Sequence, residues 1–135
     1  MTSRSFVDTN VFVYAVDDAE PAKQRIAQEL LVSIDPVIST QVVGEFFVVV
    51  GRSLGGGRRI DEARERAVRL LDLEVVAIDG DLVGRALEGS VAWGLSYWDA
   101  LIVCSAQAAG CSRLLTEDLA DGRTYGSVAV ENPFR

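Results

Sequence analysis

The feature that most constrains the fold is the alternation of short β-branched runs with longer segments of helical periodicity. Residues 36–39 and 75–78 are short apolar runs, for example, and residues 58–74 between them carry apolar side chains at helical spacing. This alternation is typical of βαβ units, in which parallel strands form one sheet that is covered by helices. The sequence therefore predicts an α/β domain with a central parallel sheet.

The predicted elements cover most of the chain. Residues 40–54 are ambiguous, because their valines favour a strand, whereas their length and a threonine at the N-cap favour a helix; we predict a helix. Residues 55–57 are a glycine break and residues 117–126 a turn-rich loop. The strands are expected at 4–8, 36–39, 75–78, 112–116 and 128–132, and the helices at 10–16, 20–33, 40–54, 58–74, 79–94 and 96–110.

Length and composition predict one domain over residues 1–135. The hydrophobic share of 49% is sufficient for a core at this size. No apolar run approaches the length of about 18 residues that spans a bilayer, and the N-terminus lacks the pattern of a secretory signal. Cys104 and Cys111 form no CxxC motif. We therefore expect a cytoplasmic protein with free thiols.

The charge and the missing histidine exclude several kinds of site. A net charge of −7 argues against a protein that coats nucleic acid by neutralising phosphates, although divalent cations held by acidic side chains would present positive charge to a phosphate. The sequence contains no histidine. This excludes catalysis by histidine pairs, Ser-His-Asp and Cys-His mechanisms, and zinc held by histidine. Any hydrolysis is expected to depend on carboxylates and hard cations.

Four acidic residues stand at positions that such chemistry would use. Asp8 ends the first predicted strand, Asp118 follows the strand at 112–116, Asp99 lies in the first turn of a helix, and Glu45 lies inside an apolar helix. Because the carboxyl ends of parallel strands meet at one edge of a sheet, Asp8 and Asp118 are expected to face each other, with Asp99 nearby. Crowded carboxylates repel each other unless a cation is present. Mg²⁺ or Mn²⁺ held by one or two carboxylates and water leaves positions for phosphate oxygens, so the pattern favours metal-assisted phosphoryl transfer or hydrolysis.

Most of these acids also have an ordinary structural explanation. Asp8 or Asn10 would cap a short helix, Ser96 and Asp99 fit a capping box, and Asp118 fits a turn. An interior-facing helical glutamate is harder to explain in this way, because a buried carboxylate requires a partner. The joint pattern therefore carries the prediction.

The segments "FVDTNVFVYA", "ISTQVVGEFF", "YWDALIVCSA" and "LLTEDL" resemble, in this order, the four acidic motifs of the PIN-domain ribonucleases, most closely the VapC-type toxins of toxin–antitoxin pairs. The resemblance extends from about residue 5 to residue 132. It implies a three-layer α/β/α fold with a central parallel sheet and a Mg²⁺- or Mn²⁺-dependent endoribonuclease. The implied acidic cluster, with its metal ligands, is Asp8, Glu45, Asp99 and Asp118. The implied partners are RNA, a second copy of the chain in a homodimer, and a small antitoxin that often inserts an arginine into the acidic site.

The resemblance also implies supporting residues. Asn10 and Thr116 fall where the family places polar support, and the Thr116 hydroxyl would orient a water on the metal. Glu117 is interpreted as facing solvent or supporting the site, and Asp121 as a candidate accessory ligand. The sequence departs from the family pattern by Glu117 in the fourth motif and by its strongly acidic overall charge.

Contacts to RNA are predicted in the arginine-rich segment 52–69, at Arg52, Arg58 and Arg59. A solvated helix face stabilised by pairs of opposite charge explains the same arginines. Trp98, beside the third acidic motif, either stacks on a base or packs against the preceding helix.

Two other functions share parts of this pattern. A haloacid-dehalogenase-like phosphatase begins with a strand followed by Asp-x-Asp, whereas this sequence has Asn10 at the second position and its one lysine, Lys23, in a predicted surface helix. A catalytically inactive PIN-like binding module would keep the fold without the chemistry. RNA cleavage assayed with and without divalent metal separates these alternatives.

Overall fold

A computed structural model describes residues 3–53 and 57–135, and the side chains at 53 and 57–59 lie outside the description. Six strands form one sheet in the order β3-β2-β1-β4-β6-β5. The strands are β1 (Arg4–Val7), β2 (Asp35–Ser39), β3 (Glu74–Val76), β4 (Arg113–Leu115), β5 (Thr124–Tyr125) and β6 (Val128–Glu131), and the helices are α1 (Thr9–Ala15), α2 (Pro21–Ser33), α3 (Thr40–Ser53), α4 (Gly57–Leu70), α5 (Gly80–Trp93) and α6 (Tyr97–Ala108).

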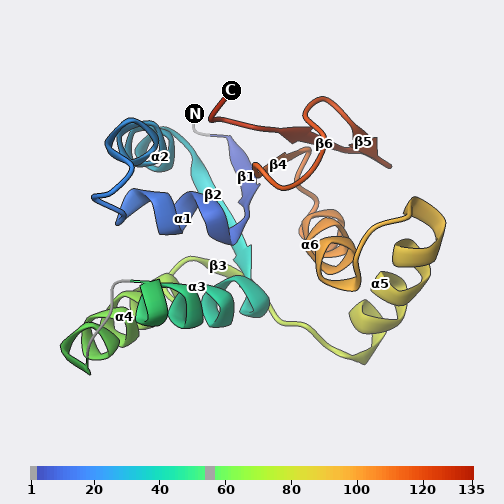
Figure 1. The fold of residues 1–135 in the computed structure, drawn as a ribbon. Helices are drawn as coiled ribbons and strands as arrows, with labels where there is room; N and C mark the ends of the chain where they lie inside the picture. Colours follow the sequence, from blue (N-terminus) through green and yellow to red (C-terminus); the bar gives the residue numbers. More distant parts are fainter. Residues whose placement is uncertain (1–2, 54–56) are drawn as a thin grey trace.

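The helices cover both faces of the sheet. Figure 1 shows α1 to α4 on one side of the strands and α5 and α6 on the other. Central β1 pairs in parallel with β2 and with β4, with Phe6 aligned to Val37 on one side and to Leu114 on the other. These three side chains are fully or almost fully buried. The predicted three-layer α/β/α fold is confirmed.

The edge of the sheet differs from the prediction. Five strands are parallel, but β5 pairs antiparallel with β6, so the sheet is mixed rather than purely parallel. The predicted loop 117–126 contains β5, a strand too short to leave an apolar pattern. Gly126, with a φ of 62°, makes the turn between these two strands, a backbone conformation that favours glycine.

Local signals account for most helix boundaries. Pro21 stands at the start of α2, where its missing N–H is not needed. The Asp79 side chain accepts a hydrogen bond from the Leu82 N–H at the start of α5, and α5 ends at Gly94 with a φ of 67°. Residues 40–53 of the ambiguous segment form a helix, as predicted, and residue 54 lies outside the described residues. Residues 55 and 56 of the predicted glycine break lie outside the described residues, and Gly57 begins α4.

Among the helices of the described residues, α6 is the most deeply buried. All seven residues from Ala100 to Ala106 are buried, because α6 lies between the sheet and α5 (Figure 1). A helix that is apolar on every side is suited to such a position. Its N-terminus opens at the same edge of the sheet as the ends of β1 and β4, which brings Asp99 towards the strands. The described part of the chain holds no helix with the length and apolarity of a membrane span.

Candidate active site

Asp8 lies at the carboxyl end of β1 and is the N-cap of α1. One carboxylate oxygen accepts a hydrogen bond from the Thr9 N–H at 2.7 Å, so the capping interpretation is correct. The residue is only 5% exposed. Burial raises the pKa of Asp8 from 3.8 to about 7; the hydrogen bonds from Thr116 and Thr9 oppose this increase, and the negative charges of Asp118 and Glu45 add to it. A buried carboxylate held in this way is costly in the absence of a cation.

The Thr116 hydroxyl connects the end of β4 to Asp8. It donates to Asp8 Oδ2 at 2.7 Å and accepts from Asn10 Nδ2 at 3.2 Å and from the Asp118 N–H at 3.0 Å. One donor and two acceptor positions are all that a hydroxyl offers. Thr116 therefore orients Asp8, and its proton is engaged there rather than on a water as the resemblance implied.

Asn10 connects Asp118 to the hydrogen bonds around Thr116. The Asn10 Nδ2 donates to Asp118 Oδ2 at 3.1 Å as well as to Thr116. Asn10 Oδ1 accepts from the Glu117 N–H at 3.4 Å. The ends of β1 and β4 thus bring residues that are more than a hundred positions apart into one hydrogen-bonded network, as the parallel-sheet argument predicted.

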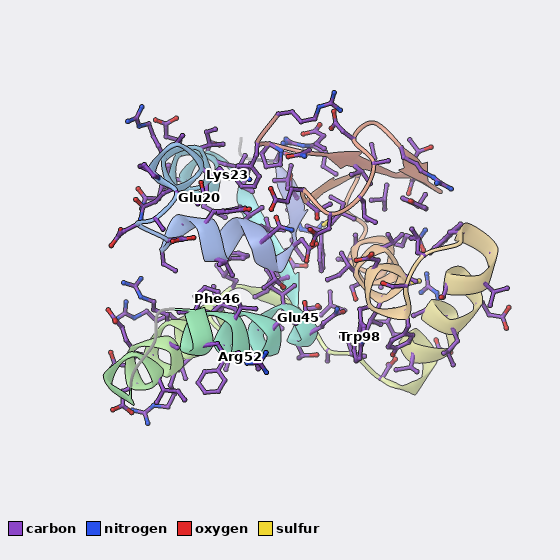
Figure 2. All side chains as sticks on the ribbon, in the orientation of Figure 1. Glu20, Lys23, Glu45, Phe46, Arg52 and Trp98 are labelled. Atoms are coloured by element: carbon purple, nitrogen blue, oxygen red, sulfur yellow. The ribbon has the colours of Figure 1, made fainter. Side chains whose placement is uncertain are left out.

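Glu45 faces this network from α3, which begins directly after β2. Its Oε1 accepts from the Thr9 hydroxyl at 2.9 Å, and its Oε2 accepts from Gln41 Nε2 at 3.4 Å. The same Gln41 nitrogen donates to the Trp98 carbonyl at 3.3 Å, across the gap to α6. Figure 2 shows Glu45 near the start of α3, with Trp98 across from it. Gln41 was not among the site residues predicted from the sequence.

Asp99 lies in the first turn of α6 and belongs to a capping arrangement. The Ser96 side chain accepts a hydrogen bond from the Asp99 N–H at 3.1 Å. Burial raises the pKa of Asp99, the hydrogen bond with Ser96 opposes this change, and the charge of Asp118 adds to it. Asp99 lines the same pocket as Asp8, Glu45 and Asp118.

All four acids line one pocket with a volume of about 720 Å³. The wall of this pocket combines these acids with apolar side chains. Trp98 contributes to the wall and is 60% exposed, so it does not pack away against the preceding helix. The lining consists of Asp8, Thr9, Asn10, Val13, Tyr14, Gln41, Gly44, Glu45, Val48, Val49, Trp98, Asp99, Ile102 and Asp118.

The donor chemistry of this pocket suits a hard divalent cation, because every charged ligand is a carboxylate. Both oxygens of Asp8 already accept one hydrogen bond each and retain a free lone pair. However, in the described residues no three Cys, Asp or Glu side chains are close enough together to hold an ion. The arrangement therefore fits binding through one or two carboxylates with water, the usual pattern for Mg²⁺, rather than a closed cage of protein ligands.

Other predicted site residues do not line this pocket. Asp121 accepts hydrogen bonds from the Asn132 N–H at 2.8 Å and from Arg135 at 3.3 Å, so it fastens the C-terminal segment. Glu117 pairs with Lys23 at 3.1 Å. Arg52 is exposed near the end of α3 (Figure 2).

The side chains of Arg58 and Arg59, the other predicted RNA contacts, lie outside the described residues. Trp93, the other tryptophan of the chain, packs against Tyr125, with the two ring centroids 5.2 Å apart. Tyr14 was not singled out from the sequence, because a tyrosine in an apolar run gives no sign that it lines a pocket.

Comparisons with known proteins agree with this geometry. The PIN domain family matches residues 5–122. The search of curated proteins gives no significant match. VapC20 of Mycobacterium tuberculosis, a toxin described as cleaving the sarcin–ricin loop, has a similar structure, with 26% identity and a TM-score of 0.68 over 83% of this chain and 87% of that chain.

Two toxin–antitoxin complexes share the fold at lower identity. A complex from Klebsiella pneumoniae has 20% identity and a TM-score of 0.69, over 96% of this chain and 97% of that chain. VapBC2 of Rickettsia felis, bound to a fragment of promoter DNA, has 20% identity and a TM-score of 0.66, over 96% and 98%. The family match covers most of the sequence and the four acids meet at one pocket, so this chain belongs to the PIN-domain family and has the fold of the VapC-type toxins.

Proposed function

We propose that this chain is a divalent-metal-dependent endoribonuclease and the toxin of a toxin–antitoxin pair. The observation that carries the proposal is the convergence of Asp8, Glu45, Asp99 and Asp118 on one pocket from four separate parts of the sequence. The family match supports the assignment and disfavours the phosphatase alternative. The similarity to VapC20, described as a toxin that cleaves the sarcin–ricin loop, and to two toxin–antitoxin complexes points the same way.

In this proposal Asp8, Glu45, Asp99 and Asp118 would hold Mg²⁺ or Mn²⁺, one or two of them by direct coordination and the others through bound water. At such a site the metal would supply an activated water and would offset the charge that builds up on the leaving oxygen. Asp8 contributes a carboxylate whose orientation is fixed by Thr116 and by the backbone of Thr9. The expected products carry a 5′-phosphate and a 3′-hydroxyl.

Other residues hold the acids at fixed positions. Asn10 holds Asp118 by a hydrogen bond, and the Thr9 hydroxyl and Gln41 hold Glu45. Such residues around a metal-binding cluster commonly control affinity as strongly as the ligands do. Asn10 and Thr116 therefore remain support residues in this proposal, with Thr116 acting on Asp8.

The apolar side chains in the wall of the pocket support a protein partner at this site. The proposed antitoxin packs apolar side chains along Val48 and Val49, which are 46% and 38% exposed, and inserts an arginine between the carboxylates. A homodimer is also proposed. Val68 and Leu71 on and after α4 are more than half exposed and continue a groove with Phe47. Apolar groups left open in this way commonly become interfaces.

Cleavage of structured RNA tests the catalytic proposal. A ribosomal stem-loop of the kind named for VapC20 is the first substrate to try, with Mg²⁺, with Mn²⁺ and with EDTA. Cleavage should stop in EDTA and should fall by at least about 100-fold in Asp8→Asn and Asp99→Asn. Glu88→Gln, an exposed acid on α5, is the matched control and should cut normally. Cleavage that persists in EDTA or in both variants would contradict the assigned site. A wild-type chain that binds metal but cuts no RNA would support the inactive binding module.

A further inference from the structure

Beside the pocket, side chains from four segments of the chain meet around the amino group of Lys23, the only lysine of the chain. One of them, Tyr14, also lines the pocket. Lys23 Nζ on α2 donates to Tyr14 Oη and to Glu117 Oε2, each at 3.1 Å, and Tyr14 Oη donates to Glu117 Oε1 at 2.5 Å. The same nitrogen lies 4.6 Å from the centroid of the Tyr14 ring and 5.8 Å from that of Phe134. Figure 2 shows Lys23 on the side of α2 that faces the sheet.

This cluster is partly shielded from water. The side chains of Lys23 and Glu117 are 35% and 23% exposed, respectively. The hydrogen bonds to Tyr14 and Glu117 raise the pKa of Lys23, so its amino group stays charged at neutral pH. When one partner of a shielded ion pair is removed, the other charge is left without compensation, which costs more than the loss of an exposed pair.

The cluster is joined to the acidic pocket through the backbone of one short segment. Glu117 stands between Thr116, which donates to Asp8, and Asp118, which lines the pocket. Its own N–H donates to Asn10 Oδ1 at 3.4 Å. The Glu117 side chain points to Lys23 and Tyr14 and is not among the lining of the pocket in the described residues. Fixing Glu117 on one side of the segment therefore fixes the direction of Asp118 on the other.

We propose that Lys23 is a positioning residue of the acidic site, which acts through Tyr14 and Glu117 to hold the segment Thr116–Asp118 in place. Lys23 touches none of the four pocket acids and acts by orientation. This inference rests on the proposed metal-dependent function for its consequence, but the ordering of the segment is testable by itself.

The experiment compares Lys23→Met, which removes the charge at similar length, with Arg113→Met. Arg113 on β4 pairs with Glu131 on the neighbouring strand β6 at 3.0 Å, and their side chains are 31% and 48% exposed. This partly exposed ion pair is the matched control for the pair of Lys23 and Glu117. Binding of Mn²⁺ alone to the purified chain is measured by calorimetry. We expect the dissociation constant to rise about 10-fold in Lys23→Met and less than about 2-fold in Arg113→Met.

Two further variants separate positioning from a general loss of stability. Lys23→Arg keeps the charge and should recover at least half of the lost affinity. Adding Glu117→Gln to Lys23→Met should also recover part of it, because the uncompensated carboxylate is gone. A structural defect alone would show neither recovery.

Amide hydrogen exchange gives a readout that does not depend on metal or RNA. The N–H groups of Glu117 and Asp118 should exchange about 10-fold faster in Lys23→Met than in the wild-type chain, while Arg113→Met leaves them unchanged. Equal exchange and equal Mn²⁺ affinity in the Lys23 and Arg113 variants would overturn the inference. If the wild-type chain neither bound Mn²⁺ nor cut RNA, the proposed function would fail, whereas the exchange measurement would still decide the role of Lys23.

Discussion

Replacing Asp8 with asparagine should stabilise the metal-free protein at alkaline pH, although the same change abolishes the proposed activity. The folded state raises the pKa of Asp8 from 3.8 to about 7 because the carboxyl is buried. At 1.36 kcal/mol per pKa unit, this rise corresponds to a penalty of roughly 4 kcal/mol for ionised Asp8. Asp8 is only 5% exposed, so solvent screens little of this penalty. An acidic pocket of this kind therefore reduces stability for the sake of function.

The sign of the pH dependence follows from proton binding. Between pH 3.8 and about 7 the folded state holds the Asp8 proton and the unfolded state has lost it. The contribution of Asp8 to the free energy of unfolding is therefore most favourable below pH 3.8 and decreases as the pH rises towards 7. Asn at this position does not titrate. It can still accept from the Thr9 N–H but loses the bond from Thr116, whose oxygen already accepts two others, at a cost of about 1–2 kcal/mol.

Urea unfolding in EDTA, at several pH values from 4 to 8, measures the effect. Asp8→Asn should be about 1–2 kcal/mol less stable than the wild-type chain near pH 4 and about 2–3 kcal/mol more stable at pH 8. Groups that titrate equally in both proteins cancel in this comparison. Glu88→Gln should show no such trend. A stability difference between Asp8→Asn and wild type that stays constant over this pH range would refute the reasoning.

Three other predictions concern the same site and the packing around it. Binding of Mn²⁺ should release close to one proton at pH 6 and almost none at pH 8.5, because Asp8 must lose its proton; calorimetry in two buffers of different ionisation enthalpy measures this, and no release at pH 6 would contradict it. Thr116→Val should destabilise the chain by about 2 kcal/mol, since it removes three hydrogen bonds of a buried hydroxyl. Thr116→Ser should keep most of these bonds, so an equal loss of stability in the two variants on thermal unfolding would contradict the prediction. Gly89→Ala should cost about 1–3 kcal/mol, because a Cβ would lie 2.5 Å from the Trp93 ring. In the same helix, a Cβ added at Gly84 meets nothing within 4 Å, so Gly84→Ala should stabilise the chain by up to about 1 kcal/mol. A melting temperature of Gly89→Ala equal to or above that of Gly84→Ala would contradict this prediction.

Local signals were sufficient to predict most of the secondary structure. β-branched runs, helical periodicity and caps such as Ser96 act between residues that are close in the chain, so they can be read without knowledge of the fold. The helix predicted at 40–54 was correct over residues 40–53, because a segment of fourteen residues is too long for a typical strand. The prediction of the strands was incomplete, because it missed β5. The two residues of β5 form a strand only because β6 lies alongside them.

The acids of the site were also predictable, because the carboxyl ends of parallel strands must meet at one edge. That rule places Asp8 and Asp118 together without any coordinates. It does not say what holds them. The bonds of Thr116 to Asp8 and of Gln41 to Glu45 depend on side-chain directions that only the packed helices and strands decide.

The sequence by itself determined an α/β chain with carboxylates at the ends of its elements and no histidine to work with them. Only the tertiary structure decided that Lys23 faces Glu117 rather than solvent and that Asp121 fastens the C-terminal segment instead of lining the pocket. The physical reason is that periodicity and strand order fix which end of an element a residue occupies. The partner of a charged side chain depends on contacts between segments far apart in the chain, and no local pattern encodes them.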